Sequence, residues 1–277
     1  MEPIKKAIER LRSKRPVEFD LTKYRRPDFR QPVPVVGRAA REDVLTNEVQ
    51  LNPRVLEANR IVGHDSADPR SMPFDMLRTQ LLQATDRKKW QFVGITSPTP
   101  GCGKTFTAIN LALSIARHPE RSALLVDMDL QRPKVAEYLG LASSSGLIDV
   151  LQNLMSVEDA IEQVSVGGAQ CAVLRGGHSS SDSAGWMASR SMSDVFAELK
   201  HNYRSRLVIL DLPPVLSSDD VITILPQIDC IVLVVAAGIT TPTQIEDCGR
   251  HLQAADVVRI VLNKAPDSSM TFHGGGY

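Results

Sequence analysis

The chain has 277 residues, of which 43% are hydrophobic and 5% aromatic, so it is long enough to bury a sizeable core of the α/β kind. Its 32 basic and 32 acidic side chains cancel, and its four cysteines lie far apart with no C-x-x-C pair, which argues against a zinc site or a disulfide framework and favours a reducing cytoplasm. No apolar run approaches the roughly 18 residues that cross a bilayer, so we expect any membrane role to depend on a partner.

The first segment, residues 1–45, is predicted to be a basic and largely disordered arm. Residues 1–42 hold 12 Lys or Arg against 6 Asp or Glu, and prolines and charges break any periodicity after residue 15. Such an arm can contact anionic lipid, nucleic acid or an acidic partner. The alternative is a solvated tail with no binding role.

Residues 46–266 are predicted to form one domain in which strands and helices alternate, preceded by a helical lead-in at 46–88. Several strands are apolar on both faces, which predicts a doubly wound, mostly parallel sheet with helices on both faces. Residues 267–277 read as a flexible tail. The predicted strands are 90–96, 122–127, 171–175, 206–211, 230–237 and 258–262. The predicted helices are 51–61, 76–84, 106–117, two short ones within 145–164, 191–203, and one that Thr241 caps and Pro242 begins.

Residues 97–105, Ser-Pro-Thr-Pro-Gly-Cys-Gly-Lys-Thr, stand between the strand at 90–96 and the helix at 106–117. A glycine loop before a helix offers backbone N–H groups and a helix N-terminus to a phosphate, Lys104 can reach the outer phosphates, and the Thr105 hydroxyl can ligate Mg²⁺. Pro98 replaces the first glycine of the usual P-loop pattern, and an ordinary glycine-rich turn is the alternative. The residues expected to contact the nucleotide here are Pro100, Gly101, Cys102, Gly103, Lys104, Thr105 and Phe106.

Three aspartates end the two strands that follow the loop. Asp127 and Asp129 close the strand at 122–127, and Asp211 closes the strand at 206–211. Ligands of open parallel sheets lie beyond the carboxyl ends of the strands, and phosphoryl transfer needs Mg²⁺, positive charge and a carboxylate near the nucleophile. We expect Asp211 to hold the Mg²⁺ of Thr105 through water, and Asp127 to bind Mg²⁺ or to accept a proton. Alone, an aspartate at a strand end is more often a helix cap or a turn former, and only the three together with the loop indicate the site.

The loop after the last strand, residues 263–267, is typical of a segment that reads a nucleotide base. Pro266 stands between Ala265 and Asp267, where a guanine reader would place the aspartate directly after the alanine. We therefore expect adenine, with Asn263 at the base edge. The alternative is an ordinary turn at a strand end.

Together the segments 96–105, 124–129, 209–215 and 261–264 resemble a deviant P-loop ATPase of the partition and Min-system superfamily. Within it, the chain is most similar to the cytosolic bacterial tyrosine kinases of polysaccharide export, including those that accompany exosortase systems. The resemblance covers residues 70–265. Partition ATPases usually carry a signature lysine where this chain has Thr99, which favours the kinases.

This resemblance implies ATP and Mg²⁺ as cofactors and matches Lys104, Asp127 and Asp129 to catalytic positions and Thr105, Asp127 and Asp211 to metal positions. It implies a cytoplasmic autokinase that regulates exopolysaccharide or capsule export and phosphorylates tyrosines in the tail of another copy, which makes Tyr277 the candidate acceptor. It further implies a homo-oligomer and a membrane chain-length-determinant protein that activates the kinase and recruits it to the membrane's inner face.

The chain departs from the family pattern at three places. Gln131 replaces an arginine after the second aspartate motif. Met72, Asp75 and Arg78 occupy the positions of the E-x-x-R-x-x-R oligomerisation pattern, and the tail holds Tyr277 rather than a tyrosine cluster. These departures keep a second hypothesis open, an ATPase switch of the same fold that controls a membrane co-polymerase. A third, a partition-type ATPase with its basic arm on DNA, is disfavoured by Thr99, so nucleic acid is an unlikely partner.

Overall fold

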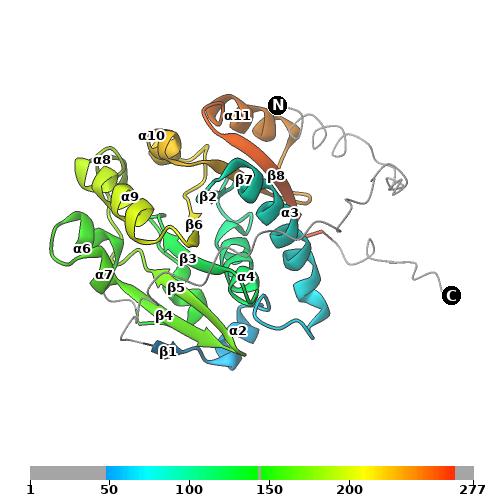
Figure 1. The fold of residues 1–277 in the computed structure, drawn as a ribbon. Helices are drawn as coiled ribbons and strands as arrows, with labels where there is room; N and C mark the ends of the chain where they lie inside the picture. Colours follow the sequence, from blue (N-terminus) through cyan, green and yellow to red (C-terminus); the bar gives the residue numbers. More distant parts are fainter. Residues whose placement is uncertain (1–47, 143–144, 266–277) are drawn as a thin grey trace.

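The computed structural model describes residues 48–142 and 145–265 (Figure 1). The predicted arm at 1–45 and the predicted tail at 267–277, with Tyr277, lie outside the described residues and stay predictions. Across the segments that are described, no helix combines the length and the apolar character that a membrane span requires.

An eight-stranded sheet forms the centre of the molecule, with the strand order β1-β4-β5-β3-β6-β2-β7-β8. All neighbouring strands run parallel except β4 and β5, so the predicted mostly parallel sheet is confirmed. The strands are β1 Glu48–Gln50, β2 Phe92–Thr96, β3 Ser122–Asp127, β4 Ile161–Val166, β5 Ala169–Leu174, β6 Arg206–Asp211, β7 Cys230–Ala236 and β8 Asp256–Asn263.

Two apolar cores lie on opposite faces of this sheet, because alternate side chains of each strand point to opposite sides. Phe92 of β2 belongs to one core, whereas Val93 and Ile95 of the same strand belong to the other. One core is covered by α2 Pro53–Ala58, α3 Met72–Lys88, α4 Lys104–Ala116 and α5 Val135–Leu139, with η2 Pro69–Ser71 leading into α3. The other is covered by α6 Leu147–Leu151, α7 Val157–Ala160, α8 Ser183–Met187, α9 Arg190–Asn202, α10 Asp220–Ile224, η3 Leu225–Gln227 and α11 Pro242–His251.

The prediction of two short helices within 145–164 is wrong from Ile161 onward, because the chain forms strand β4 there. This strand pairs antiparallel with β5 around Gly167 and Gly168, which have φ of 56° and 83°. Two glycines with positive φ make the tight turn that matches the twist of a hairpin. The Gly-Gly pair between two apolar stretches was therefore a usable signal for this hairpin.

Two further predicted boundaries are corrected by the structure. The strand at 90–96 is not the first, because β1 precedes it and pairs in parallel with β4. Three residues with one apolar side chain give no period to detect. The helix predicted at 76–84 spans Met72–Lys88. Its last four residues are polar and carry no apolar pattern, and it ends where Lys89 turns left-handed with φ of 57°.

Candidate active site

The loop before α4 has the backbone that a phosphate cradle requires. Gly101 and Gly103 have φ of 80° and 96°, a region that side chains other than glycine rarely adopt. Gly103 is also closely approached, because a Cβ atom there would lie 2.1 Å from the Asn263 Nδ2 atom. α4 then begins at Lys104, so the first N–H groups of a 13-residue helix point into the loop.

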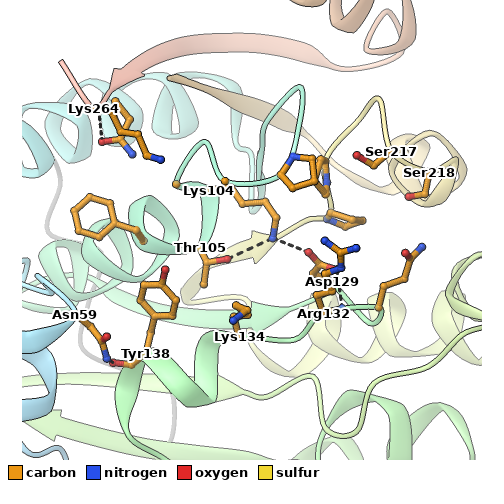
Figure 2. Close-up of a pocket in the computed structure, with 18 of the residues that line it drawn as sticks. Asn59, Lys104, Thr105, Asp129, Arg132, Lys134, Tyr138, Ser217, Ser218 and Lys264 are labelled. Atoms are coloured by element: carbon orange, nitrogen blue, oxygen red, sulfur yellow. Dashed lines mark hydrogen bonds and ion pairs between the residues drawn. The ribbon is translucent and has the colours of Figure 1, made fainter. Parts of the chain in front are cut away.

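A cavity of about 740 Å³ opens above this loop at the carboxyl ends of the strands. Figure 2 shows Lys104 and Thr105 near its centre, with Asp129 and Arg132 on one side and Lys264 on another. It is lined by Asn59, Arg60, Pro100, Gly101, Gly103, Lys104, Thr105, Phe106, Asp129, Gln131, Arg132, Lys134, Tyr138, Pro213, Pro214, Ser217, Ser218, Asn263 and Lys264. Its five lysines and arginines face one aspartate, an excess of positive charge that suits a polyphosphate.

The Lys104 ammonium lies between two carboxylates. Its Nζ atom is 2.8 Å from Asp129 Oδ2 and 3.4 Å from Asp211 Oδ1. Burial lowers the pKa of Lys104, but the charges of Asp211 and Asp129 outweigh it, so the pKa lies above its usual range. The side chain is therefore a fixed positive charge at the floor of the cavity.

Asp211 at the end of β6 is fully buried, and its Oδ2 atom has no hydrogen-bond partner within 48–142 and 145–265. Burial raises the pKa of Asp211, and the neighbouring Lys104 opposes that shift. A buried carboxylate oxygen without a partner is costly unless a cation or a water approaches it. Because Thr105, with its hydroxyl 3.4 Å from Lys104 Nζ, stands beside the same ammonium, the residues present fit a Mg²⁺ ion held by Thr105 and Asp211.

Asp127 lies behind the cavity rather than in its wall. Its Oδ2 atom accepts hydrogen bonds from the Lys134 and Val135 N–H groups, at 2.8 and 2.9 Å, and its Oδ1 atom accepts from the Asp129 N–H group at 3.2 Å. Burial, and next the charge of Asp211, raise its pKa. Asp127 thus holds in place the segment between β3 and α5 and the start of α5. Asp129 is the carboxylate that faces the cavity.

Asn263 connects the end of β8 to the glycine loop. Its Nδ2 atom donates to the Cys102 carbonyl at 2.9 Å, and its Oδ1 atom accepts from the Lys264 N–H group at 2.8 Å. Phe106 lines the same cavity and packs edge-on against Phe74, with ring centroids 5.6 Å apart. Asn263 and six of the seven residues predicted to contact the nucleotide from 100–106 therefore line one cavity, whereas Cys102 is fully buried and is not part of its wall.

Several residues of the cavity wall were absent from the sequence prediction. Asn59 follows α2, and its Nδ2 atom donates to the Tyr138 carbonyl of α5 at 3.0 Å, which ties two distant helices together. Arg60 has a left-handed backbone, with φ of 58°. The sequence around Asn59 and Arg60 and the sequence around Tyr138 carry no motif. Only the packing of α2 against α5 could therefore show that these residues line the cavity.

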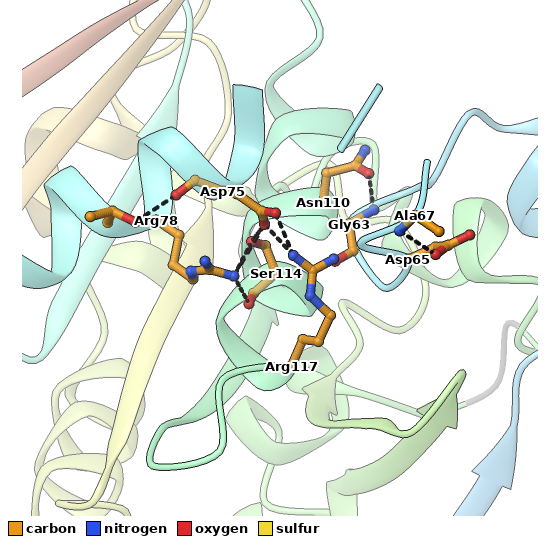
Figure 3. A network of polar contacts seen from close by, with 9 residues as sticks. Gly63, Asp65, Ala67, Asp75, Arg78, Asn110, Ser114 and Arg117 are labelled. Carbon is orange, nitrogen blue, oxygen red and sulfur yellow. Dashed lines mark hydrogen bonds and ion pairs between the residues drawn. The ribbon is translucent and has the colours of Figure 1, made fainter. Parts of the chain in front are cut away.

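The positions of the oligomerisation pattern lie on α3, and two of them bond within the chain (Figure 3). Asp75 is ion-paired with Arg117, and Arg78 donates to the Ser114 carbonyl at 3.0 Å. Both partners belong to the C-terminal end of α4 or directly follow it. Met72 is 49% exposed.

Comparison with known proteins gives matches over most of the domain. A family model described as "ParA: NUBPL iron-transfer P-loop NTPase" matches residues 89–261. EpsB of Ralstonia solanacearum, named as a tyrosine-protein kinase, is 31% identical over 76% of this chain and 27% of its own length. The tyrosine-protein kinase YwqD of Bacillus subtilis is 30% identical over 68% of this chain and 78% of its own.

Among solved structures, the kinase domain of the Escherichia coli tyrosine kinase ETK superposes with a TM-score of 0.68 and 25% identity. The match covers 78% of this chain and 84% of that one. The chain spans about a quarter of the length of the first curated relatives it matches.

Proposed function

We propose that this chain, which belongs to the ParA-type P-loop NTPases and within them to the bacterial tyrosine kinases, is an ATP- and Mg²⁺-dependent protein-tyrosine kinase. The P-loop NTPase fold implies nucleotide binding. The observation that carries the proposal is Lys104, held between Asp129 and Asp211 at the floor of the cavity.

Each residue of the site has a role in this proposal. The loop at 100–105 binds the phosphates, and Lys104 stabilises the negative charge that develops on the γ-phosphate. Thr105 and Asp211 would hold Mg²⁺, which offsets the charge of the β- and γ-phosphates when bound. Asp129 accepts the proton of the attacking hydroxyl, while Asp127 holds the segment between β3 and α5 in position through the N–H groups of Asp129, Lys134 and Val135.

The acceptor we propose is Tyr277 of another copy of the chain. The hydroxyl oxygen of Tyr277 forms a bond to the γ-phosphorus, the bond to the bridging oxygen breaks, and ADP leaves with the electron pair. The relatives are named as tyrosine kinases, and the resemblance stated above supports a role in exopolysaccharide or capsule export. It also supports activation and membrane recruitment by a chain-length-determinant protein.

A second candidate is an ATPase switch of the same fold. It is favoured by α3, where Asp75 and Arg78 bond to α4 of the same chain rather than presenting a free charged pattern to a neighbouring copy. In that case ATP binding controls a partner and no phosphotyrosine forms.

The test is to incubate the full chain with Mg²⁺ and ATP, with and without the cytoplasmic segment of a candidate activator. Phosphate is then mapped by mass spectrometry. Phosphotyrosine at Tyr277, lost in Tyr277→Phe and in Lys104→Met, would support the kinase. Nucleotide binding without phosphotyrosine in either condition would overturn it in favour of the switch.

A further inference from the structure

Gln131 lines the nucleotide cavity two residues after Asp129, and its amide nitrogen is held from behind. The Nε2 atom donates to Ser183 Oγ at 2.8 Å and to Asp220 Oδ2 at 3.3 Å. Ser183 begins α8 and Asp220 begins α10, which both cover the core that contains Phe92. Two helices on that face of the sheet therefore anchor one side chain of the cavity wall.

The orientation of this amide follows from its neighbours. Ser183 Oγ and Asp220 Oδ2 both accept from the same Gln131 nitrogen, so the amide edge that faces them is the NH₂ group. Asp220 is fully buried, and Ser183 is 2% exposed, so neither can turn away toward solvent. The amide nitrogen is therefore fixed inward and the Oε1 oxygen points away from it.

Gln131 itself is exposed to the cavity, and among the described parts of the chain no hydrogen bond reaches its Oε1 atom. Asp129 lines the same cavity; its Oδ2 atom is 2.8 Å from Lys104 Nζ and its Oδ1 atom accepts from the Arg132 N–H group at 3.1 Å, which leaves each oxygen a further lone pair. The cavity wall thus presents two acceptors, the Gln131 carbonyl oxygen and the Asp129 carboxylate. A water molecule has two O–H bonds to donate, whereas a tyrosine hydroxyl has one. An arginine at position 131 would offer only donors.

We propose that Gln131 positions the attacking water for ATP hydrolysis, a reaction that the site performs beside phosphoryl transfer to tyrosine. This inference rests on the proposed nucleotide site. The water donates one O–H to Gln131 Oε1 and the other to Asp129, which turns a lone pair toward the γ-phosphorus. The water oxygen bonds to phosphorus, the bridging bond breaks, ADP leaves with the electron pair, and the proton passes to Asp129.

The experiment measures phosphate release and phosphotyrosine in the same sample of full chain with Mg²⁺ and ATP. Gln131→Met keeps the length of the side chain and removes the oxygen. We expect hydrolysis to fall by about 10-fold or more, and to fall at least about fivefold further than phosphotyrosine formation when both are measured at saturating ATP. Gln152→Met, at an exposed glutamine after α6, is the matched control and should change neither rate.

A double variant separates positioning from packing. In Gln131→Glu with Asp220→Asn, the new amide donates to the new carboxylate, whose second oxygen again faces the cavity. Hydrolysis should recover to within about fivefold of the starting chain.

Unchanged hydrolysis in Gln131→Met, or an equal loss of hydrolysis and transfer, would overturn the inference. So would a folded double variant no faster than Gln131→Met. If the unmutated chain hydrolyses ATP but forms no phosphotyrosine, the proposed kinase activity is refuted. The role of Gln131 is then tested by comparing the loss of hydrolysis in Gln131→Met with any change in its affinity for ATP. A starting chain that does not hydrolyse ATP refutes the inference.

Discussion

Lys104 and Asp211 lie 107 positions apart in the sequence, yet the lysine Nζ atom is 3.4 Å from the aspartate Oδ1 atom. They meet because β2 and β6 are neighbouring parallel strands, with Ile95 opposite Asp211, and the glycine loop returns the chain over the end of β6. Asp129 and Asp211 place two carboxylates beside one ammonium, and Asp127 adds a third acidic group nearby, so acidic groups outnumber the lysine in a buried place.

Asp211→Asn should therefore raise the stability of the nucleotide-free protein while it removes function. Replacing a buried carboxylate whose Oδ2 atom has no partner among residues 48–142 and 145–265 should increase the free energy of unfolding by about 1 kcal/mol, as read from urea unfolding. Phosphoryl transfer with Mg²⁺ should fall by about 100-fold. A variant that is less stable than the starting chain would contradict this account of Asp211.

Gly103→Ala and Gly101→Ala form a matched pair. Both glycines have positive φ, so each alanine should cost about 1–2 kcal/mol of stability. Only at Gly103 does the added methyl meet a neighbour, the Asn263 amide, whereas nothing lies within 4 Å at Gly101.

We expect Gly103→Ala to weaken binding of an ATP analogue by at least about 10-fold more than Gly101→Ala, because Asn263 must leave the Cys102 carbonyl. Fluorescence titration measures both affinities. Equal affinities in the two variants would show that the Asn263 contact is unimportant.

Asp75→Ala should destabilise the fold by about 1–2 kcal/mol, because it leaves the Arg117 and Arg78 guanidinium groups without their carboxylate. The control is Asp86→Ala, which breaks an exposed pair with Arg121 and should change stability by less than about 0.5 kcal/mol. Denaturant unfolding of both variants provides the comparison. Equal effects would mean that the α3–α4 network adds no more than a surface ion pair.

The cysteine thiols should resist alkylation in the native protein. Burial raises the pKa of Cys171, Cys230 and Cys248 to about 12, so these thiols stay protonated at pH 8, and the thiolate is the reactive form. Mass spectrometry after iodoacetamide at pH 8 should find these three unmodified until denaturant is added. Rapid native labelling at any of them would show that its strand or helix opens locally.

The sequence by itself determined every strand except β1 and β4, the glycine loop and the three aspartates, because strong local signals mark them. Buried parallel strands need continuous apolar runs, and a phosphate cradle needs glycine where φ is positive. The helix start with Thr241 as its cap and Pro242 as its first residue is equally local and was predicted correctly. The signal for the β4–β5 hairpin, the Gly167-Gly168 pair, is also local. It was missed because the apolar spacing before it resembles that of a helix.

Only the tertiary structure decided which aspartate faces the cavity and which holds the segment between β3 and α5. Asp127 and Asp129 are two residues apart and chemically identical, but three backbone N–H groups bind the first and Lys104 binds the second. The orientation of the Gln131 amide was likewise decided by the tertiary structure, because Ser183 of α8 and Asp220 of α10 hold its nitrogen. Hydrogen-bond partners that lie 50 to 90 residues away leave no periodic trace in a sequence, so the orientation of these side chains is a property of the packed fold.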